Sequence, residues 1–476
     1  MRAALPPLAG GTSGAEALRP LLDTVLDALH EGARARGGPL PSGGPAAVAA
    51  RTAALGPVLP DTGTGAHEAL RTLVQALTEG AADPAHPLCA AHLHTPPLAL
   101  AAAADLAASA LNPSMDSWDQ APAASALEER LTAALAAEVY PQAAHPDALV
   151  TTGGTESNQL ALLLARERHG PVRTVVGANA HHSFHRAAWL LGLPEPVTVP
   201  TPNGTLEPTA LADALTRTRG PVLVAATAGT TDEGLVDPIA ALADVCTAHG
   251  AELHVDAAYG GPVLFSRTHR RLLDGLDRAR TVTVDLHKLG WQPAAAGLLA
   301  VRDTADLAAL GHTADYLNAD DDTEAGLPDL LGRSLRTTRR PDVLKTAVTL
   351  RALGRQGLGA LVDACMARAQ DLADLVEKAP GLELRARPTL TTVLFRPITA
   401  AQPTGGDLHT AATGDRTSAD DDLAAIRRTL LAGGHAVLGR AAADGRLWLK
   451  ATLLNPHATP GDLAQLITLV EGSTHR

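Results

Sequence analysis

The sequence predicts an α/β fold with a mostly parallel sheet. Short apolar runs that suit buried strands, such as Val222 to Ala226, alternate with helical patterns such as Ile239 to His249, and this alternation is typical of βαβ units. Several of these runs end at polar residues or glycines, where parallel sheets usually bind their ligands. We expect three parts: a helical segment over residues 1–85, a large domain over 86–353 and a small α+β domain over 354–476.

The N-terminal part contains two predicted helices, Ala15 to Arg36 and Ala66 to Glu79, with the breaker-rich segment GGPLPSGGP between them. The run from Leu98 to Leu111 that follows is apolar and rich in alanine, but it is too short to span a bilayer. We therefore expect this run to form a buried helix.

The segment TTGGTESN, Thr151 to Asn158, lies between an apolar stretch that ends at Val150 and a helical run from Gln159 to Arg168. Paired glycines allow a sharp turn, and the free N–H groups at the start of a helix form a site for phosphate. The segment therefore predicts a phosphate cup that opens at Gly154 and Thr155. The alternative is an ordinary strand-to-helix turn capped by threonine.

Three histidines follow the predicted strand from Val172 to Gly177. His181 is our choice to lie flat against a planar ring, whereas His182 and His185 suit surface positions on a helix. The three could instead bind a metal ion, because imidazole is a common ligand. The sequence has 19 histidines but no HExxH pattern, and its three cysteines are too far apart for a CxxC knuckle. We expect no metal site.

The segment LHVDAAY begins at Leu253 and reads as a short buried strand with Asp256 at its carboxyl end. An aspartate at that edge of a sheet can keep a pyridine nitrogen protonated. The alternative is that Asp256 has only a structural role and caps the following turn.

The segment TVTVDLHK predicts a strand from Thr281 to Val284 that ends at Asp285 and leaves His287 and Lys288 on the loop beyond it. A lysine there can present its amine to an aldehyde. Pyridoxal 5'-phosphate needs a lysine for its Schiff base and an acidic group that keeps its ring nitrogen cationic. Lys288 and Asp256 together predict this cofactor, although Lys288 alone could be a solvated surface lysine.

The C-terminal part begins with a predicted amphipathic helix, Leu358 to Lys378. Two short strands, Leu382 to Arg387 and Thr391 to Arg396, follow it, and a last helix lies near Pro460 to Glu471. The segment from Ala400 to Asp422 has loop composition, and we expect it to be a loop or disordered.

Composition restricts the classes of protein. The 476 residues are 46% hydrophobic and 19% charged, with a net charge of −12 and three cysteines. We expect a globular protein that binds neither nucleic acid nor a membrane, because basic runs are absent and the charge is negative. The N-terminal apolar stretch is too short for a signal peptide, so we expect the cytoplasm.

Five segments in this order resemble the group II pyridoxal phosphate-dependent amino acid decarboxylases: TTGGTESN, AHHS, ATAGTTDEGLVDPI, HVDAAYGG and DLHK. The resemblance covers about His86 to Ala458. Further stretches, among them AHLHTPP and SLRTTRRPDVLK, are similar to the L-2,4-diaminobutyrate and L-lysine decarboxylases. The resemblance implies the fold of type I pyridoxal phosphate-dependent transferases, with an N-terminal helical flap used for dimerisation.

The resemblance also implies roles for individual residues. Lys288 would bind the cofactor as a Schiff base, Asp256 would pair with the ring nitrogen, and His181 would stack on the ring. The cofactor's other contacts would come from Gly154, Thr155, Ala258, His287 and either Thr230 or Thr231. The family forms homodimers with shared active sites, so the amino acid substrate would meet His92, His94, Trp118 and Tyr316, some of them across the interface.

The sequence departs from the family at three places. The loop from Leu317 to Arg333 lacks the expected tyrosine. The group that protonates the product carbanion could therefore be His181, Tyr316 or Lys288, and His181 is our first choice. Residues 289–291 and 294–297 also differ from the resembled enzymes and could reshape the pocket.

The expected reaction is decarboxylation of a diamino acid similar to 2,4-diaminobutyrate. The alternatives are decarboxylation of lysine, ornithine or an acidic amino acid, the reaction of an aminotransferase or a decarboxylating aldehyde synthase, and a scaffold without activity. The acidic residues Asp320, Asp321, Asp322 and Glu324 could attract a diamine, or they could form a solvated loop.

Overall fold

The computed structural model describes residues 5–312, 314, 317–398 and 413–473, with the side chains of 413–418 left out. The chain forms two compact units. The larger unit consists of Leu93–Ala369 and Pro388–Thr392, and the smaller unit combines the chain up to His92 with Gln370–Arg387 and the chain from Val393. The division at residues 85 and 353 that the sequence suggested stays a prediction.

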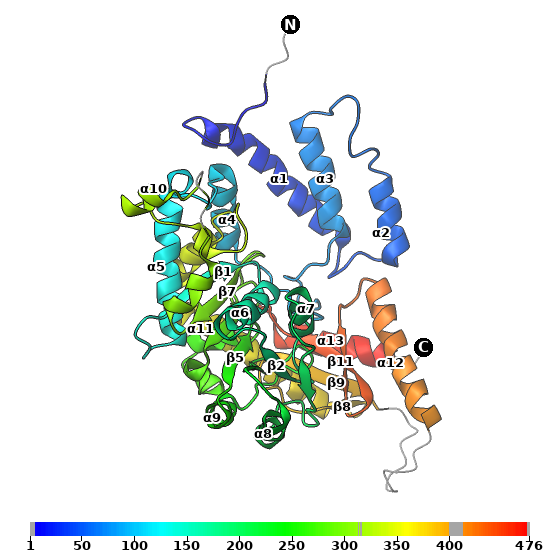
Figure 1. The fold of residues 1–476 in the computed structure, drawn as a ribbon. Coiled ribbons are helices and arrows are strands. Elements are labelled where there is room, and N and C mark those ends of the chain that lie inside the picture. The colour runs from blue at the N-terminus through cyan, green and yellow to red at the C-terminus, as the bar shows by residue number, and fades with distance from the viewer. Residues whose placement is uncertain (1–4, 313, 315–316, 399–412, 474–476) are drawn as a thin grey trace. The chain divides into compact units, whose positions relative to one another are not determined.

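The larger unit is built on a seven-stranded sheet in the order β1-β7-β6-β5-β4-β2-β3. Its strands are β1 (Asp147–Thr151), β2 (Arg173–Gly177), β3 (Val197–Val199), β4 (Val222–Thr227), β5 (Glu252–Ala257), β6 (Thr281–Asp285) and β7 (Gly297–Val301) (Figure 1). Only β7 runs against its neighbours β1 and β6, while the pairs from β6 to β3 are parallel. The predicted α/β fold with a mostly parallel sheet is confirmed, and the carboxyl ends of β1, β4, β5 and β6 meet at one edge.

The larger unit also contains several helices. They are α4 (Ala99–Leu111), α5 (Pro122–Val139), α6 (Gly154–His169), α7 (Ser183–Leu190), α8 (Pro208–Arg217), α9 (Ile239–His249), α10 (Asp320–Glu324) and the first part of α11 (Val343–Lys378). Helix α6 takes part in two buried clusters: Leu162 packs with β2, β4 and α7, and Leu164 packs with β1 and β7. This double packing fixes the first turn of α6 against the edge where the strands end.

The smaller unit contains three N-terminal helices, α1 (Gly14–Arg36), α2 (Gly44–Ala53) and α3 (Ala66–Gly80), and Figure 1 shows α1 and α3 lying side by side. It also contains a four-stranded sheet in the order β10-β11-β9-β8. The remaining elements are β8 (Leu382–Leu384), β9 (Thr392–Pro397), α12 (Thr413–Ala432), β10 (Gly439–Ala443), β11 (Arg446–Thr452) and α13 (Pro460–Ser473). The predicted helices of α1, α3 and α13 are confirmed.

Three expectations about these elements were wrong. Helix α4 is buried on one face only, at Ala101, Ala104 and Ala108, while Leu106 and Leu111 are exposed. Residues 413–422 belong to α12 and not to a loop; residues 399–412 lie outside the described part. The segment from 317 to 333 is not only a loop, because its acidic residues form the short helix α10.

Two further helices differ from the sequence pattern. The span of α11 contains two helical segments that meet at a kink at Gly354, where φ is 64°. The predicted helix Leu358 to Lys378 lies in the second segment, and the first segment, which begins at Val343, was not predicted. Helix α2 follows directly on the breaker-rich segment, and Pro45 occupies its first turn, where proline costs no hydrogen bond. Within the described residues, no helix is long and apolar enough to cross a membrane.

Candidate active site

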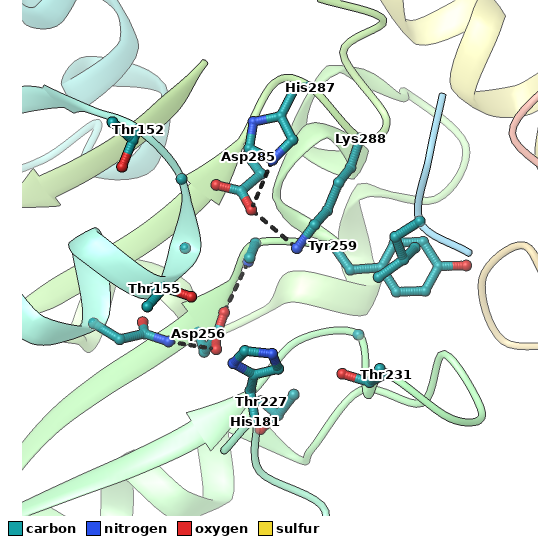
Figure 2. A pocket seen from close by; sticks show the side chains of 16 residues that line it. Thr152, Thr155, His181, Thr227, Thr231, Asp256, Tyr259, Asp285, His287 and Lys288 are labelled. Carbon is teal, nitrogen blue, oxygen red and sulfur yellow. Dashed lines mark hydrogen bonds and ion pairs between the residues drawn. The ribbon is translucent and has the colours of Figure 1, made fainter. Parts of the chain in front are cut away.

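A pocket of about 290 Å³ opens at the edge where the strands of the large sheet end. Figure 2 shows Lys288 reaching toward Asp285, with His181 and Asp256 in another part of the pocket. The lining consists of Leu93, Thr152, Gly153, Gly154, Thr155, Asn158, His181, Thr227, Gly229, Thr231, Asp256, Ala258, Tyr259, Asp285, His287 and Lys288.

The turn between β1 and α6 leaves no room for side chains at its two glycines. A Cβ atom at Gly154 would lie 3.0 Å from the Cβ atom of Ala258, and one at Gly153 would lie 3.0 Å from Cε1 of His287. Gly153 also has a φ of 153°, which favours glycine. The first turn of α6 therefore borders the pocket closely, and its free backbone N–H groups are suited to an anion.

The amine of Lys288 lies beside a buried carboxylate. Its Nζ atom is 2.9 Å from Oδ2 of Asp285, and Nε2 of His287 is 3.5 Å from the same oxygen. The other oxygen of Asp285, Oδ1, is buried and has no hydrogen-bond partner among the residues that the structure describes. Burial lowers the pKa of His287, whose Nδ1 atom accepts a hydrogen bond from the N–H of Ala296.

Asp256 is held at both carboxylate oxygens. Its Oδ2 atom accepts a hydrogen bond of 2.8 Å from Nδ2 of Asn158, and its Oδ1 atom accepts one of 3.1 Å from the N–H of Ala258. The side chain projects from the end of β5, because Asp256 and Ala257 are the last two residues of that strand.

The surroundings of His181 favour the neutral form of its ring. Burial lowers its pKa below the usual 6.5, although the charge of Asp256 acts in the opposite direction. Its Nδ1 atom accepts a hydrogen bond of 3.3 Å from the N–H of Ser183. The single ring proton therefore lies on Nε2, where it is available for donation.

Two hydroxyl groups near the pocket are already bound within the protein. The phenol oxygen of Tyr259 lies within 2.9 Å of the hydroxyls of Thr391 and Thr392, and burial raises the pKa of this tyrosine. The hydroxyl of Thr230 accepts a hydrogen bond from the N–H of Leu235. Thr231, and not Thr230, lines the pocket.

The structure brings together most of the residues that the sequence singled out. Lys288, Asp256, His181, Gly154, Thr155, Thr231, Ala258 and His287 all line the pocket. His94 and Trp118 belong to the same unit but do not line it, His92 belongs to the smaller unit, and Tyr316 lies outside the described residues.

Sequence reasoning gave no role to several lining residues, among them Asn158, Thr227, Tyr259 and Asp285. The sequence placed Asn158 at the end of TTGGTESN and Asp285 at the end of the strand before Lys288. It did not indicate which side chains these two residues contact. Residues 289–291 and 294–297 do not line this pocket, and Leu289 and Trp291 are fully buried; the expected reshaping stays a prediction.

A family model described as the pyridoxal-dependent decarboxylase conserved domain matches residues 59–398. The chain belongs to this decarboxylase family. Its relatives include L-2,4-diaminobutyrate decarboxylase of Rhizobium meliloti (strain 1021), 40% identical over 430 residues, which cover 88% of this chain and 84% of the relative. The enzyme of the same name from Acinetobacter baumannii is 31% identical over 446 residues, with 87% and 85% covered.

Solved structures agree with the family. The glutamate decarboxylase domain of diaminobutyrate-pyruvate transaminase and L-2,4-diaminobutyrate decarboxylase from Vibrio parahaemolyticus superposes with a TM-score of 0.84 at 29% identity. The match covers 98% of this decarboxylase and 97% of that chain. The fold is therefore that of type I pyridoxal phosphate-dependent enzymes, as the sequence predicted.

The residues of the pocket fit pyridoxal phosphate, the cofactor of this family. The glycine turn leaves space for a phosphate at the start of α6, and Lys288 offers an amine for the aldehyde. Two buried oxygens at the pocket, Oδ1 of Asp285 and Oγ1 of Thr227, lack partners within the described residues and can accept or donate to a ligand. Those residues contain no group of three His, Cys, Asp or Glu side chains that could hold a metal ion.

Proposed function

We propose that this enzyme decarboxylates L-2,4-diaminobutyrate to 1,3-diaminopropane and CO2. The observation that carries the reaction type is the pocket in which Lys288 and Asp256 reach the same cavity from neighbouring strands. The choice of substrate is supported by the 40% identity to the enzyme of Rhizobium meliloti, which extends over most of both chains.

Bound pyridoxal phosphate supplies an aldehyde that joins to an amine and a ring that accepts the electron pair left when the bond to the carboxyl carbon breaks. Lys288 would hold the cofactor by offering its amine to this aldehyde. Asp285 keeps that amine in place, because its carboxylate lies 2.9 Å from Nζ. Asp256 would offer its carboxylate to the ring nitrogen and so keep the ring cationic.

His181 is our proposed proton donor to the α-carbon. Its ring proton lies on Nε2, and the ring lines the pocket beside Asp256. Tyr259, the tyrosine in the pocket lining, is a poorer donor because its hydroxyl is shared with Thr391 and Thr392. Gly154, Thr155 and His287 would hold the phosphate, and Thr231 would lie near the ring hydroxyl.

We also propose that the enzyme is a cytoplasmic homodimer. Helices α1 and α3 expose several leucines, including Leu26 and Leu77, which are 63% and 75% exposed. Exposed apolar groups on adjacent helices are typical of surfaces that a partner covers. His92, His94, Trp118 and Tyr316 stay proposed substrate contacts within such a dimer.

The proposed location in the cytoplasm is supported by the cysteines. The buried thiols of Cys246 and Cys365 are free, as is usual in reducing compartments.

The test is the release of CO2 and amine by the cofactor-loaded enzyme from diaminobutyrate, ornithine, lysine, diaminopropionate, glutamate, aspartate and aromatic amino acids, with Lys288→Ala as the blank. We expect diaminobutyrate to give both products in equal amounts. Aldehyde and ammonia in place of the amine would contradict the reaction, and preference for another amino acid would contradict the substrate. Sedimentation of the loaded enzyme at a single-chain mass would contradict the dimer.

A further inference from the structure

A row of buried polar side chains adjoins Asp256, and its first member, Asn158, also lines the pocket. It consists of Asn158 on α6, His254 on β5, and Thr281 and Thr283 on β6, all of them at most 1% exposed. Burying so many polar groups is costly unless each has a partner. The pattern of hydrogen bonds shows that each does.

The amide of Asn158 uses its full capacity for hydrogen bonds. Its Nδ2 atom donates to Oδ2 of Asp256 at 2.8 Å and to Oγ of Ser183 at 2.9 Å. Its Oδ1 atom accepts from Oγ1 of Thr283 at 2.8 Å and lies 3.0 Å from Nε2 of His254. An asparagine side chain has two donor hydrogens and two acceptor sites, so none remains unused.

The direction of every bond in this row follows from the carboxylate. A carboxylate only accepts, so Asn158 must turn its NH2 group toward Asp256 and its oxygen toward His254. His254 must then carry its proton on Nε2. Its Nδ1 atom lies 2.8 Å from Oγ1 of Thr281 and accepts from that hydroxyl. Burial lowers the pKa of His254 to about 4, which keeps the ring neutral at neutral pH.

We propose that Asn158 and His254 are positioning residues that hold the carboxylate of Asp256 in one orientation toward the ring nitrogen of the cofactor. This inference rests on the proposed function and adds to it two residues that act through Asp256. A carboxylate whose orientation is fixed before the reaction stabilises charge on the ring without first having to reorganise. The geometry that Asp256 needs is therefore determined by α6 and β6 as well as by its own strand.

Three variants separate the parts of this row. Asn158→Asp keeps the shape of the side chain but replaces the donor to Asp256 with a second carboxylate oxygen. His254→Leu removes the donor to Asn158, whereas His254→Gln restores an N–H at nearly the position of Nε2. Thr174→Val is the matched control, because Thr174 is equally buried in strand β2 of the same sheet and its hydroxyl has no partner among the described residues.

The readout is equilibrium binding of two ligands to the full-length, cofactor-free enzyme: pyridoxal phosphate and its 1-deaza analogue, in which a C–H replaces the ring nitrogen. The wild type and Thr174→Val should prefer pyridoxal phosphate. Asn158→Asp and His254→Leu should lose at least about tenfold of that preference, the effect of one hydrogen bond to a charged group. His254→Gln should recover most of it. The pair of His254 variants answers the question even if Asn158→Asp fails to fold.

Equal weakening of both ligands in the variants would overturn the inference, because it would mean that the row only supports the fold. An unchanged preference in His254→Leu would overturn it as well. If the wild type bound no pyridoxal phosphate at all, the proposed function would fail and this inference with it, so the two failures are distinguishable.

Discussion

The two acidic side chains of the pocket are held in contrasting ways. Both oxygens of Asp256 have protein donors, and the amide that donates to it is saturated with hydrogen bonds. Asp285 shares one oxygen between Lys288 and His287, and its other oxygen has no partner in the described part of the chain. The end of the pocket at Asp256, which we propose meets the ring nitrogen, is thus fixed in advance, while the end at Lys288, the proposed reacting amine, keeps hydrogen-bonding capacity for a ligand.

The difference arises from the pairing of strands. In the register of β5 and β6, His254 lies opposite Thr281 and Asp256 lies opposite Thr283. Alternate residues of a strand point to the same face, so these four side chains meet on one face of the sheet. Lys288 lies beyond the end of β6, on a loop, where no strand pairing restrains it.

The largest effect is expected at the amine. Lys288→Ala should lower the release of CO2 by at least about a thousandfold, as removal of a group that bonds to the reacting molecule usually does. Lys378→Ala is the control, since this lysine is exposed at the end of α11. If the Lys288→Ala enzyme retained a tenth of the activity, the amine of Lys288 would not be the reacting group. The contrast between the two ends of the pocket would then be wrong.

A smaller loss is expected at the fixed end. Asp256→Asn keeps the shape of the side chain but removes its charge, so turnover should fall by about a hundredfold, the usual effect of one missing electrostatic contact to the transition state. Single-turnover measurements with saturating cofactor will separate this loss from weaker binding. Turnover within threefold of the wild type would show that the ring nitrogen has no need of Asp256.

A substitution in the glycine turn should affect the binding of the cofactor and not the rate of the reaction. Gly154→Ala places a Cβ atom 3.0 Å from Ala258 and 3.2 Å from Oδ2 of Asp285, so the dissociation constant for pyridoxal phosphate should rise about tenfold. Gly63→Ala, at a glycine with open space around it, should leave the constant unchanged. Equal constants for both variants would mean that phosphate binds elsewhere.

The smallest effect concerns stability and pH. Unfolded His254 takes up a proton near pH 6.5, whereas its pKa in the folded protein is about 4. Between these values the unfolded chain binds more protons, so stability falls as the pH falls. From pH 7 to pH 5.5 this group alone should cost about 1 kcal/mol. Urea unfolding of the cofactor-free enzyme should show a steeper loss for the wild type than for His254→Gln, and parallel losses would contradict the prediction.

Much of the pocket was predictable because the decisive residues follow short apolar strands. Lys288 and Asp256 each come just after or at the end of such a strand, and the glycines of TTGG mark the turn into α6. The row that adjoins Asp256 was not predictable, because Asn158 and His254 are 96 positions apart in the sequence. Their contact depends on the register of β5 and on how α6 packs across the sheet.

The same reasoning explains the errors in the fold. Patterns of apolar residues identify a helix but not how much of its surface other elements cover, so α4 was expected to be a buried helix and not one with a single buried face. The helical segment of α11 before the kink at Gly354 was missed, and the polar composition around 413–422 led to a predicted loop where α12 begins. Contacts that a second chain would supply, such as those proposed for Trp118, have no signal within one sequence.

The most direct test of the central claim is to identify the lysine that binds the cofactor. The sequence has only four lysines, Lys288, Lys345, Lys378 and Lys450, and Lys345 is fully buried in ion pairs with Asp105 and Asp342. Reduction of the loaded enzyme with borohydride, followed by peptide mass mapping, fixes the cofactor to its lysine. We predict one pyridoxyl group per chain, on Lys288. A label on any other lysine, or no label on a chain that has bound the cofactor, would contradict the account.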